Sequence, residues 1–161
     1  MKQYTMRLDL NHQRPVVMLK NGLTALLDTG AYIPIWTDDE KILVSRLGAK
    51  LIQRDVPISG FGGSTCGNMY KVTMDIGGIL YPELHIVANN ELNVSFNFII
   101  SATMFEGLMY QIDTVNHVLN IDVPDHESNI RNMKVVIRTG DCMFFAVRQI
   151  RFLLMMRMYT P

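Results

Sequence analysis

Six consecutive residues read Leu26-Leu27-Asp28-Thr29-Gly30-Ala31, and both the fold and the chemistry expected for the chain depend on them. An apolar run leads directly into an aspartate that is followed by small residues. The hydroxyl of Thr29 can form hydrogen bonds there, and Gly30 permits close approach of a second backbone or a ligand. Such a loop can hold Asp28 partly desolvated against a second carboxylate. Two aspartates that share one proton cannot both ionise, so one acts as acid and the other as base toward a bound water.

Two segments further along the chain belong with this one. The first is a glycine-rich turn, Ile58-Ser59-Gly60-Phe61-Gly62-Gly63, and the second is Phe98-Ile99-Ile100-Ser101-Ala102-Thr103-Met104-Phe105. The three segments together resemble the retropepsin-like aspartic peptidase family, over residues 1–124. That family has an Asp-Thr-Gly-Ala loop, a glycine-rich flap over the bound peptide, and two apolar residues and a glycine that open a short helix. Ser101 stands where that glycine is expected, and serine is small and a good helix N-cap.

The resemblance implies an all-β fold, a retropepsin-like acid protease barrel with one or two short helices. It also implies an aspartic endopeptidase that cleaves peptide or protein substrates without a cofactor. Asp28 would be the catalytic residue and Thr29, Gly30 and Ala31 the active-site loop. The substrate-binding flap would comprise Ile58, Ser59, Gly60, Phe61, Gly62 and Gly63, and the second family motif would comprise Ile99, Ile100 and Ser101.

A single Asp-Thr-Gly occurs in the sequence, since Asp113-Thr114-Val115 lacks the glycine. A two-lobed pepsin-like chain would need two such motifs and a much longer sequence. The resemblance therefore implies a homodimer in which the two copies of Asp28 meet at a two-fold axis, with Thr29 bonding across it. A catalytically silent dimeric binding or interaction module with the same barrel is the alternative. Ser101 and the unexplained C-terminal residues 125–161 favour that alternative, and the intact Asp-Thr-Gly disfavours it.

The residue pattern by itself also predicts a domain of many short strands joined by glycine turns. A short helix is expected over residues 38–48, where apolar residues have helical spacing and Gly48 can end it. A helical turn is expected from Ala102 to Glu106, capped by Ser101 and closed by Gly107. Tight turns are expected at Asn21-Gly22, Gly60 to Thr65, Gly77-Gly78 and Asn116. Strands are expected over residues 4–10, 16–19, 23–27, 51–59, 68–76, 79–87, 96–100, 109–113 and 117–123.

Composition excludes several other classes of protein. The 161 residues fit one domain, and 15 basic residues balance 15 acidic ones, so no attraction to nucleic acid follows. Two cysteines and four histidines without ligand spacing predict no metal site. Neither a signal-peptide core nor an apolar run long enough to span a membrane is present in the sequence, which favours a cytoplasmic protein.

Residues 125–161 form a C-terminal extension beyond the family resemblance. Met133 to Ile137 and Cys142 to Val147 can pair as a hairpin through Thr139-Gly140-Asp141. The segment from Arg148 to Met158 is rich in arginine, leucine and methionine. A dimer-interface strand, a helix packed on the barrel and a membrane-surface segment are all compatible with that composition.

Overall fold

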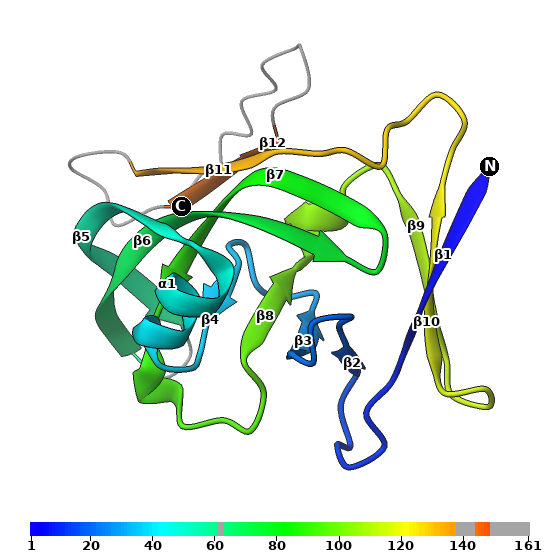
Figure 1. The fold of residues 1–161 in the computed structure, drawn as a ribbon, viewed down its shortest axis with the longest axis horizontal. Helices are drawn as coiled ribbons and strands as arrows, with labels where there is room; N and C mark the ends of the chain where they lie inside the picture. Colours follow the sequence, from blue (N-terminus) through cyan, green and yellow to red (C-terminus); the bar gives the residue numbers. More distant parts are fainter. Residues whose placement is uncertain (61–62, 138–143, 149–161) are drawn as a thin grey trace, which may run out of the picture.

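The computed structural model describes residues 1–60, 63–137 and 144–148 (Figure 1). It is predominantly β, which confirms the expected class, and α1 (Glu40–Leu47) is the one α-helix of the described residues. Two short 3-10 helices are η1 (Asn90–Leu92) and η2 (Ala102–Phe105). The strands are β1 (Lys2–Arg7), β2 (Val16–Met18), β3 (Thr24–Asp28), β4 (Ile35–Trp36), β5 (Lys50–Gly60), β6 (Gly63–Ile76), β7 (Ile79–Ala88), β8 (Phe98–Ser101), β9 (Met109–Asp113), β10 (Val118–Val123), β11 (Met133–Ile137) and β12 (Phe144–Arg148).

The strands form two sheets. The smaller sheet, at the right of Figure 1, has the antiparallel order β1-β10-β9. The larger sheet runs β12-β11-β7-β4-β8-β3-β2, and β6 joins it by pairing with β7 and with β5. In the described part of the chain the strand order of neither sheet closes on itself.

The centre of the larger sheet positions the Asp-Thr-Gly segment. β8 runs parallel to β3 on one side and antiparallel to β4 on the other, and β4 is in turn parallel to β7. All four residues of β8 are buried, as are Ala25, Leu26 and Leu27 of β3. A continuous apolar run is typical of a strand that is covered on both faces. The carboxyl ends of β3 and β8 therefore emerge together from the core.

One large hydrophobic cluster packs the two sheets together. It contains the fully buried side chains of Trp36, Tyr81 and Phe98, along with Ile121 from the smaller sheet. Met133 of β11 belongs to the same cluster, so the first strand of the C-terminal extension packs on the common core. β11 pairs with β7 and, antiparallel, with β12. The connection between β11 and β12, where the hairpin turn is expected, lies outside the described residues.

Several local predictions are confirmed. Asn21-Gly22 turns β2 into β3, with Gly22 at a φ of +79°. Gly77 and Gly78, both at positive φ, join β6 to β7, and a side chain at Gly78 would collide with the ring of Tyr4. The expected helix is α1, whose N-cap Asp39 accepts a hydrogen bond from a backbone amide and which ends at a left-handed Gly48.

Other local predictions are wrong or incomplete. The glycine-rich turn expected from Gly60 to Thr65 is narrower, because β6 begins at Gly63 and its ladder with β5 starts there. Ser101 occupies the N-cap position of η2, but its side chain makes no capping hydrogen bond. The sequence pattern does not predict β4 or η1, because elements of two or three residues carry no periodic signal. No helix in the described ranges is long and apolar enough to cross a membrane.

Candidate functional site

Asp28 is the last residue of β3. Its backbone is paired with that of Ser101 at the end of β8, so the first and third sequence motifs meet at neighbouring strand ends. The side chain of Asp28 is half-buried, because Leu27 before it is in the core and Thr29 after it is exposed. A carboxylate at the edge of the core, at the carboxyl ends of parallel strands, is therefore accessible from one side.

The loop after β3 orients the carboxylate of Asp28. The Gly30 amide donates a hydrogen bond to Asp28 Oδ1 at 2.9 Å, and the Ala31 amide donates to the Asp28 carbonyl at 3.2 Å. A Cβ added at Gly30 would lie 3.3 Å from Asp28 Oδ1, which is closer than an ordinary contact. Glycine at this position therefore leaves room for the Asp28 carboxylate. Within the described residues no hydrogen bond reaches Oδ2. One oxygen is thus fixed, and the other remains available to a water or a second carboxyl group.

Ala31 connects the loop to the segment from Ile99 to Ser101. It packs against a hydrophobic cluster that includes Leu26 of β3 and Ile99 of β8. Ile100, the next residue, points into the main core, and Ser101 is completely buried. The structure therefore brings the loop after Asp28 together with the segment Ile99-Ile100-Ser101.

Ser101 serves the loop through a residue that sequence reasoning missed. The Thr103 hydroxyl donates a hydrogen bond to the Tyr32 carbonyl at 2.9 Å. Because that single proton is used, Thr103 Oγ1 accepts the hydrogen bond from the Ser101 hydroxyl, 2.8 Å away. Ser101, which stands at the expected glycine position, thus orients Thr103 through a hydrogen bond. Thr103 in turn anchors the loop after Asp28 through the Tyr32 carbonyl. The Ser-x-Thr spacing was the only signal for this link, and it is a weak one.

The hairpin of β5 and β6 carries the glycine-rich segment. Its ladder runs through Ser59 opposite Ser64 to Gly60 opposite Gly63, and the two serine hydroxyls lie 3.1 Å apart. Phe61 and Gly62, expected at the flap tip, lie outside the described residues. Near the tip, the Thr65 hydroxyl donates to Glu91 Oε2 at 2.7 Å.

The half of this hairpin nearer its tip packs near the loop that follows Asp28. Val56 and Ile58 of β5 are buried in one cluster with Ile33, which lies five residues after Asp28. Val135 of β11 belongs to the same cluster. A bulge interrupts β5 at Asp55, whose φ is +54°, and bulges bend and twist the strand that carries them.

Titratable groups away from Asp28 include a tyrosine that the sequence did not single out. The Tyr70 hydroxyl donates to the Glu40 carboxylate beside a surface hollow of about 610 Å³ next to α1. Burial and the Glu40 carboxylate raise the pKa of Tyr70 to about 12. In the described ranges no three His, Cys, Asp or Glu side chains form a group that could hold a metal ion.

Comparison with protein-family models and with curated proteins finds no match to this chain.

Proposed function

We propose that this chain is one subunit of a homodimeric, retropepsin-like aspartic endopeptidase. The observation that carries the proposal is the state of Asp28, a half-buried carboxylate at a strand end with Oδ1 held by the Gly30 amide. Its Oδ2 has no partner among the described residues, which suits an oxygen that shares a proton with a second carboxyl group.

The arrangement around Asp28 supports the finer fold assignment as well. β8 separates β3 from β4, and the residue after the apolar pair Ile99 and Ile100 is paired directly with Asp28. The β5–β6 hairpin, whose residues Val56 and Ile58 share a cluster with Ile33, is the candidate flap. An extended peptide held between such a hairpin and the active-site loop would present one peptide bond to the carboxylates.

The chemistry needs two carboxyl groups that hold one proton between them. The ionised Asp28 takes a proton from a bound water, whose oxygen attacks the carbonyl carbon of the peptide bond. The protonated Asp28 of the partner subunit gives its proton to the carbonyl oxygen, which yields a tetrahedral diol. The first Asp28, now protonated, gives its proton to the nitrogen while the ionised Asp28 of the partner subunit takes a proton from one hydroxyl of the diol. The C–N bond then breaks, a carboxylic acid and an amine are released, and the pair again holds one proton. Because one proton must be present and one absent, the rate should show a bell-shaped dependence on pH.

The smaller sheet supports a homodimer. Among the described residues β9 pairs with β10 alone, and Met109, Tyr110 and Ile112 are all exposed. Ile112 is paired with the fully buried Leu119 and therefore shares its face of the sheet, yet it is 38% exposed. An apolar edge strand of this kind is normally covered by a partner. We propose a second copy of the chain as that partner, since a second copy is also what the second Asp28 requires.

The test compares two aspartates that occupy the same local geometry. Asp9 Oδ1 accepts a hydrogen bond from the Asn11 amide at 3.0 Å, as Asp28 Oδ1 does from the Gly30 amide. Wild type, Asp28→Asn and Asp9→Asn are incubated with a diverse peptide library, and cleavage sites are read by mass spectrometry. We expect Asp28→Asn to abolish cleavage and to leave the dimer intact, and Asp9→Asn to cleave like wild type.

Two outcomes would overturn the proposal. Undiminished cleavage by Asp28→Asn would place the active site elsewhere. A dimer that binds peptides but cleaves none, in wild type as in the variant, would establish the catalytically silent binding module. The buried Ser101, which replaces the family's glycine, is the observation that favours this second function.

A further inference from the structure

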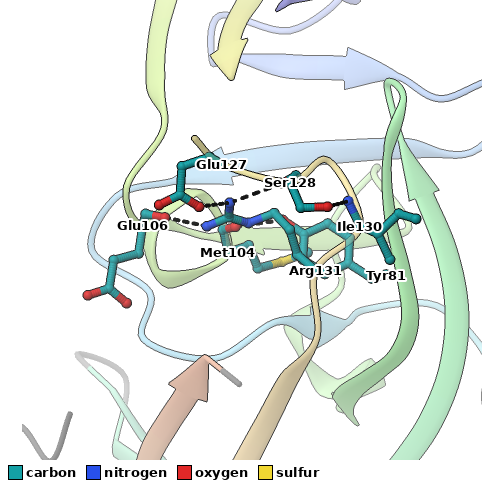
Figure 2. Close-up of polar contacts among 7 residues, drawn as sticks. All are labelled: Tyr81, Met104, Glu106, Glu127, Ser128, Ile130 and Arg131. Carbon is teal, nitrogen blue, oxygen red and sulfur yellow. Dashed lines mark hydrogen bonds and ion pairs between the residues drawn. The ribbon is translucent and has the colours of Figure 1, made fainter. Parts of the chain in front are cut away.

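Arg131 is a buried arginine in the segment that joins β10 to β11. Its side chain is 3% exposed, although arginine is seldom buried unless its charge is paired. Figure 2 shows its guanidinium between η2 and the Glu127 carboxylate. Nη1 donates to Glu127 Oε2 at 3.3 Å and to the Ser128 carbonyl at 3.5 Å, and Nη2 donates to the Glu106 carbonyl. The planar fork thus joins η2 to a segment beyond the peptidase-like residues 1–124.

The backbone around Arg131 is anchored to the start of β7. The Leu80 amide donates to the Asn129 carbonyl at 2.8 Å, and the Arg131 amide donates to the Leu80 carbonyl at 2.8 Å. The Asn129 side chain also donates to the Gly78 carbonyl at 3.1 Å. Arg131 therefore reaches η2 from a base that is fixed on the sheet.

Arg131 contacts the C-terminal end of η2. The last carbonyl groups of a helix have no partner within it, and a positive charge is favoured beside them. Arg131 donates to the Glu106 carbonyl, and the buried Tyr81 hydroxyl donates to the Met104 carbonyl at 2.6 Å (Figure 2). Two buried donors, Arg131 and Tyr81, thus bind the C-terminal end of η2.

The other end of η2 holds the active-site loop. Thr103, within η2, donates to the carbonyl of Tyr32, four residues after Asp28. Met133, two residues after Arg131, places its sulfur 3.8 Å from the same hydroxyl. A continuous series of contacts therefore runs from Arg131 through η2 and Thr103 to the loop that carries Asp28.

We infer that Arg131 is a positioning residue for the Asp28 site, acting through η2 and Thr103. The inference rests on the proposed function for its catalytic consequence, but its structural consequence can be measured without substrate. The hydrogen bonds of Arg131 to Glu127, the Ser128 carbonyl and the Glu106 carbonyl join this segment to the end of η2, and η2 in turn carries the effect to the loop. The segment from Pro124 to Met133 would then help to orient the Asp28 loop, although nearly all of it lies outside the peptidase-like residues 1–124.

The test uses Arg131→Met, which keeps the side-chain length and removes every donor. Arg131→Lys keeps the charge but cannot bind Glu106 and Glu127 together as the fork does. Thr103→Val removes the hydrogen bond to Tyr32 and keeps the shape. Arg46→Met is the matched control, since Arg46 also donates to a backbone carbonyl, that of Asn21 at 3.1 Å, but on the surface.

The first readout is amide hydrogen exchange, measured where every variant is fully folded. We expect exchange at residues 29–33 to rise about tenfold in Arg131→Met and less in Arg131→Lys, with the β9–β10 hairpin unchanged. Arg46→Met should leave residues 29–33 as in wild type. A uniform rise across the chain would show that Arg131 serves global stability alone and would overturn the inference. If Arg131→Met does not fold, the same comparison is made with Arg131→Lys.

The second readout is peptide cleavage. Misplacement of Asp28 should lower kcat about tenfold or more in Arg131→Met and leave KM nearly unchanged. Because both residues act along one path, the double variant with Thr103→Val should lose little more than Thr103→Val alone. Unchanged kcat, or losses that add fully, would overturn the inference. Absence of cleavage by wild type would instead remove the proposed function, and hydrogen exchange alone would then decide the role of Arg131.

Discussion

Gly30 lies beside the carboxylate that its own amide orients. A methyl group at this position would stand 3.3 Å from Asp28 Oδ1, which is tighter than an ordinary contact. The φ of Gly30 lies outside the left-handed region, so alanine is compatible with the backbone there. Gly48 is the opposite case, because a Cβ would meet open space but φ is +66°. The two glycines therefore separate a local effect on the site from an effect on stability.

We predict opposite outcomes for alanine at these two positions. Gly30→Ala should shift the Asp28 carboxylate and lower kcat about tenfold or more, with little change in the melting temperature. Gly48→Ala should cost about 1 kcal/mol of folding stability at the end of α1 and leave kcat unchanged. Thermal unfolding and peptide cleavage of both variants check this. A loss of stability without a loss of kcat in Gly30→Ala would show that the loop does not position the carboxylate.

At the scale of elements, the sequence predicts what local signals encode. Asn21-Gly22 and Gly77-Gly78 predict hairpins, because asparagine and glycine adopt the left-handed backbone of tight turns. Asp39 and Gly48 likewise predict the two ends of α1. The pairing of β1 with β10 has no such local signal, since its partners are more than a hundred residues apart. The same holds at the site, where Asp28 was found from its motif but the Thr103–Tyr32 bond and the buried Arg131 were not. Contacts of this kind depend on packing that a single sequence does not display.

β11 depends on a histidine in β7. The Val135 amide donates to His85 Nδ1 at 3.3 Å, which requires that nitrogen to be unprotonated. Burial lowers the pKa of His85 from its ordinary value of 6.5, and the neighbouring Lys134 and Lys71 act in the same direction. Together they outweigh the Val135 backbone and the Glu83 carboxylate, which act to raise the pKa of His85. The folded protein therefore favours the neutral imidazole, and the unfolded chain binds the proton more readily. This contribution to stability is complete above the ordinary value and is lost as pH falls through the lowered pKa.

We predict that acid weakens the attachment of β11 through His85. Between about pH 7 and pH 5 the free energy of unfolding should fall more steeply for wild type than for His85→Gln, which keeps an acceptor but does not titrate. His126→Gln, at an exposed histidine, is the control and should follow wild type. Urea unfolding at several pH values measures this. Parallel pH dependence for wild type and His85→Gln would contradict the assignment.

At the scale of the whole molecule, one chain supplies half of the proposed chemistry. The sequence has a single Asp-Thr-Gly, and we propose the exposed apolar edge of β9 as the place where a second copy binds. Edge-to-edge pairing about a two-fold axis would use the same strand from both copies, so a change on that strand acts twice in each dimer. In the proposed dimer, a change at the edge of β9 would therefore act on the Asp28 site through assembly.

The last prediction concerns this edge. Ile112→Lys places two like charges in the interface of each dimer, so it should shift the equilibrium toward monomer and abolish cleavage at concentrations where wild type is active. Val44→Lys is the control, because Val44 is also an exposed apolar residue but lies on α1. Sedimentation velocity over a dilution series, with cleavage measured on the same samples, gives both quantities. Wild type should lose activity per chain on dilution as it dissociates, and Val44→Lys should do the same at the same concentrations. A dimer that survives Ile112→Lys would move the interface away from β9, and cleavage by a wild-type monomer would remove the need for a second Asp28.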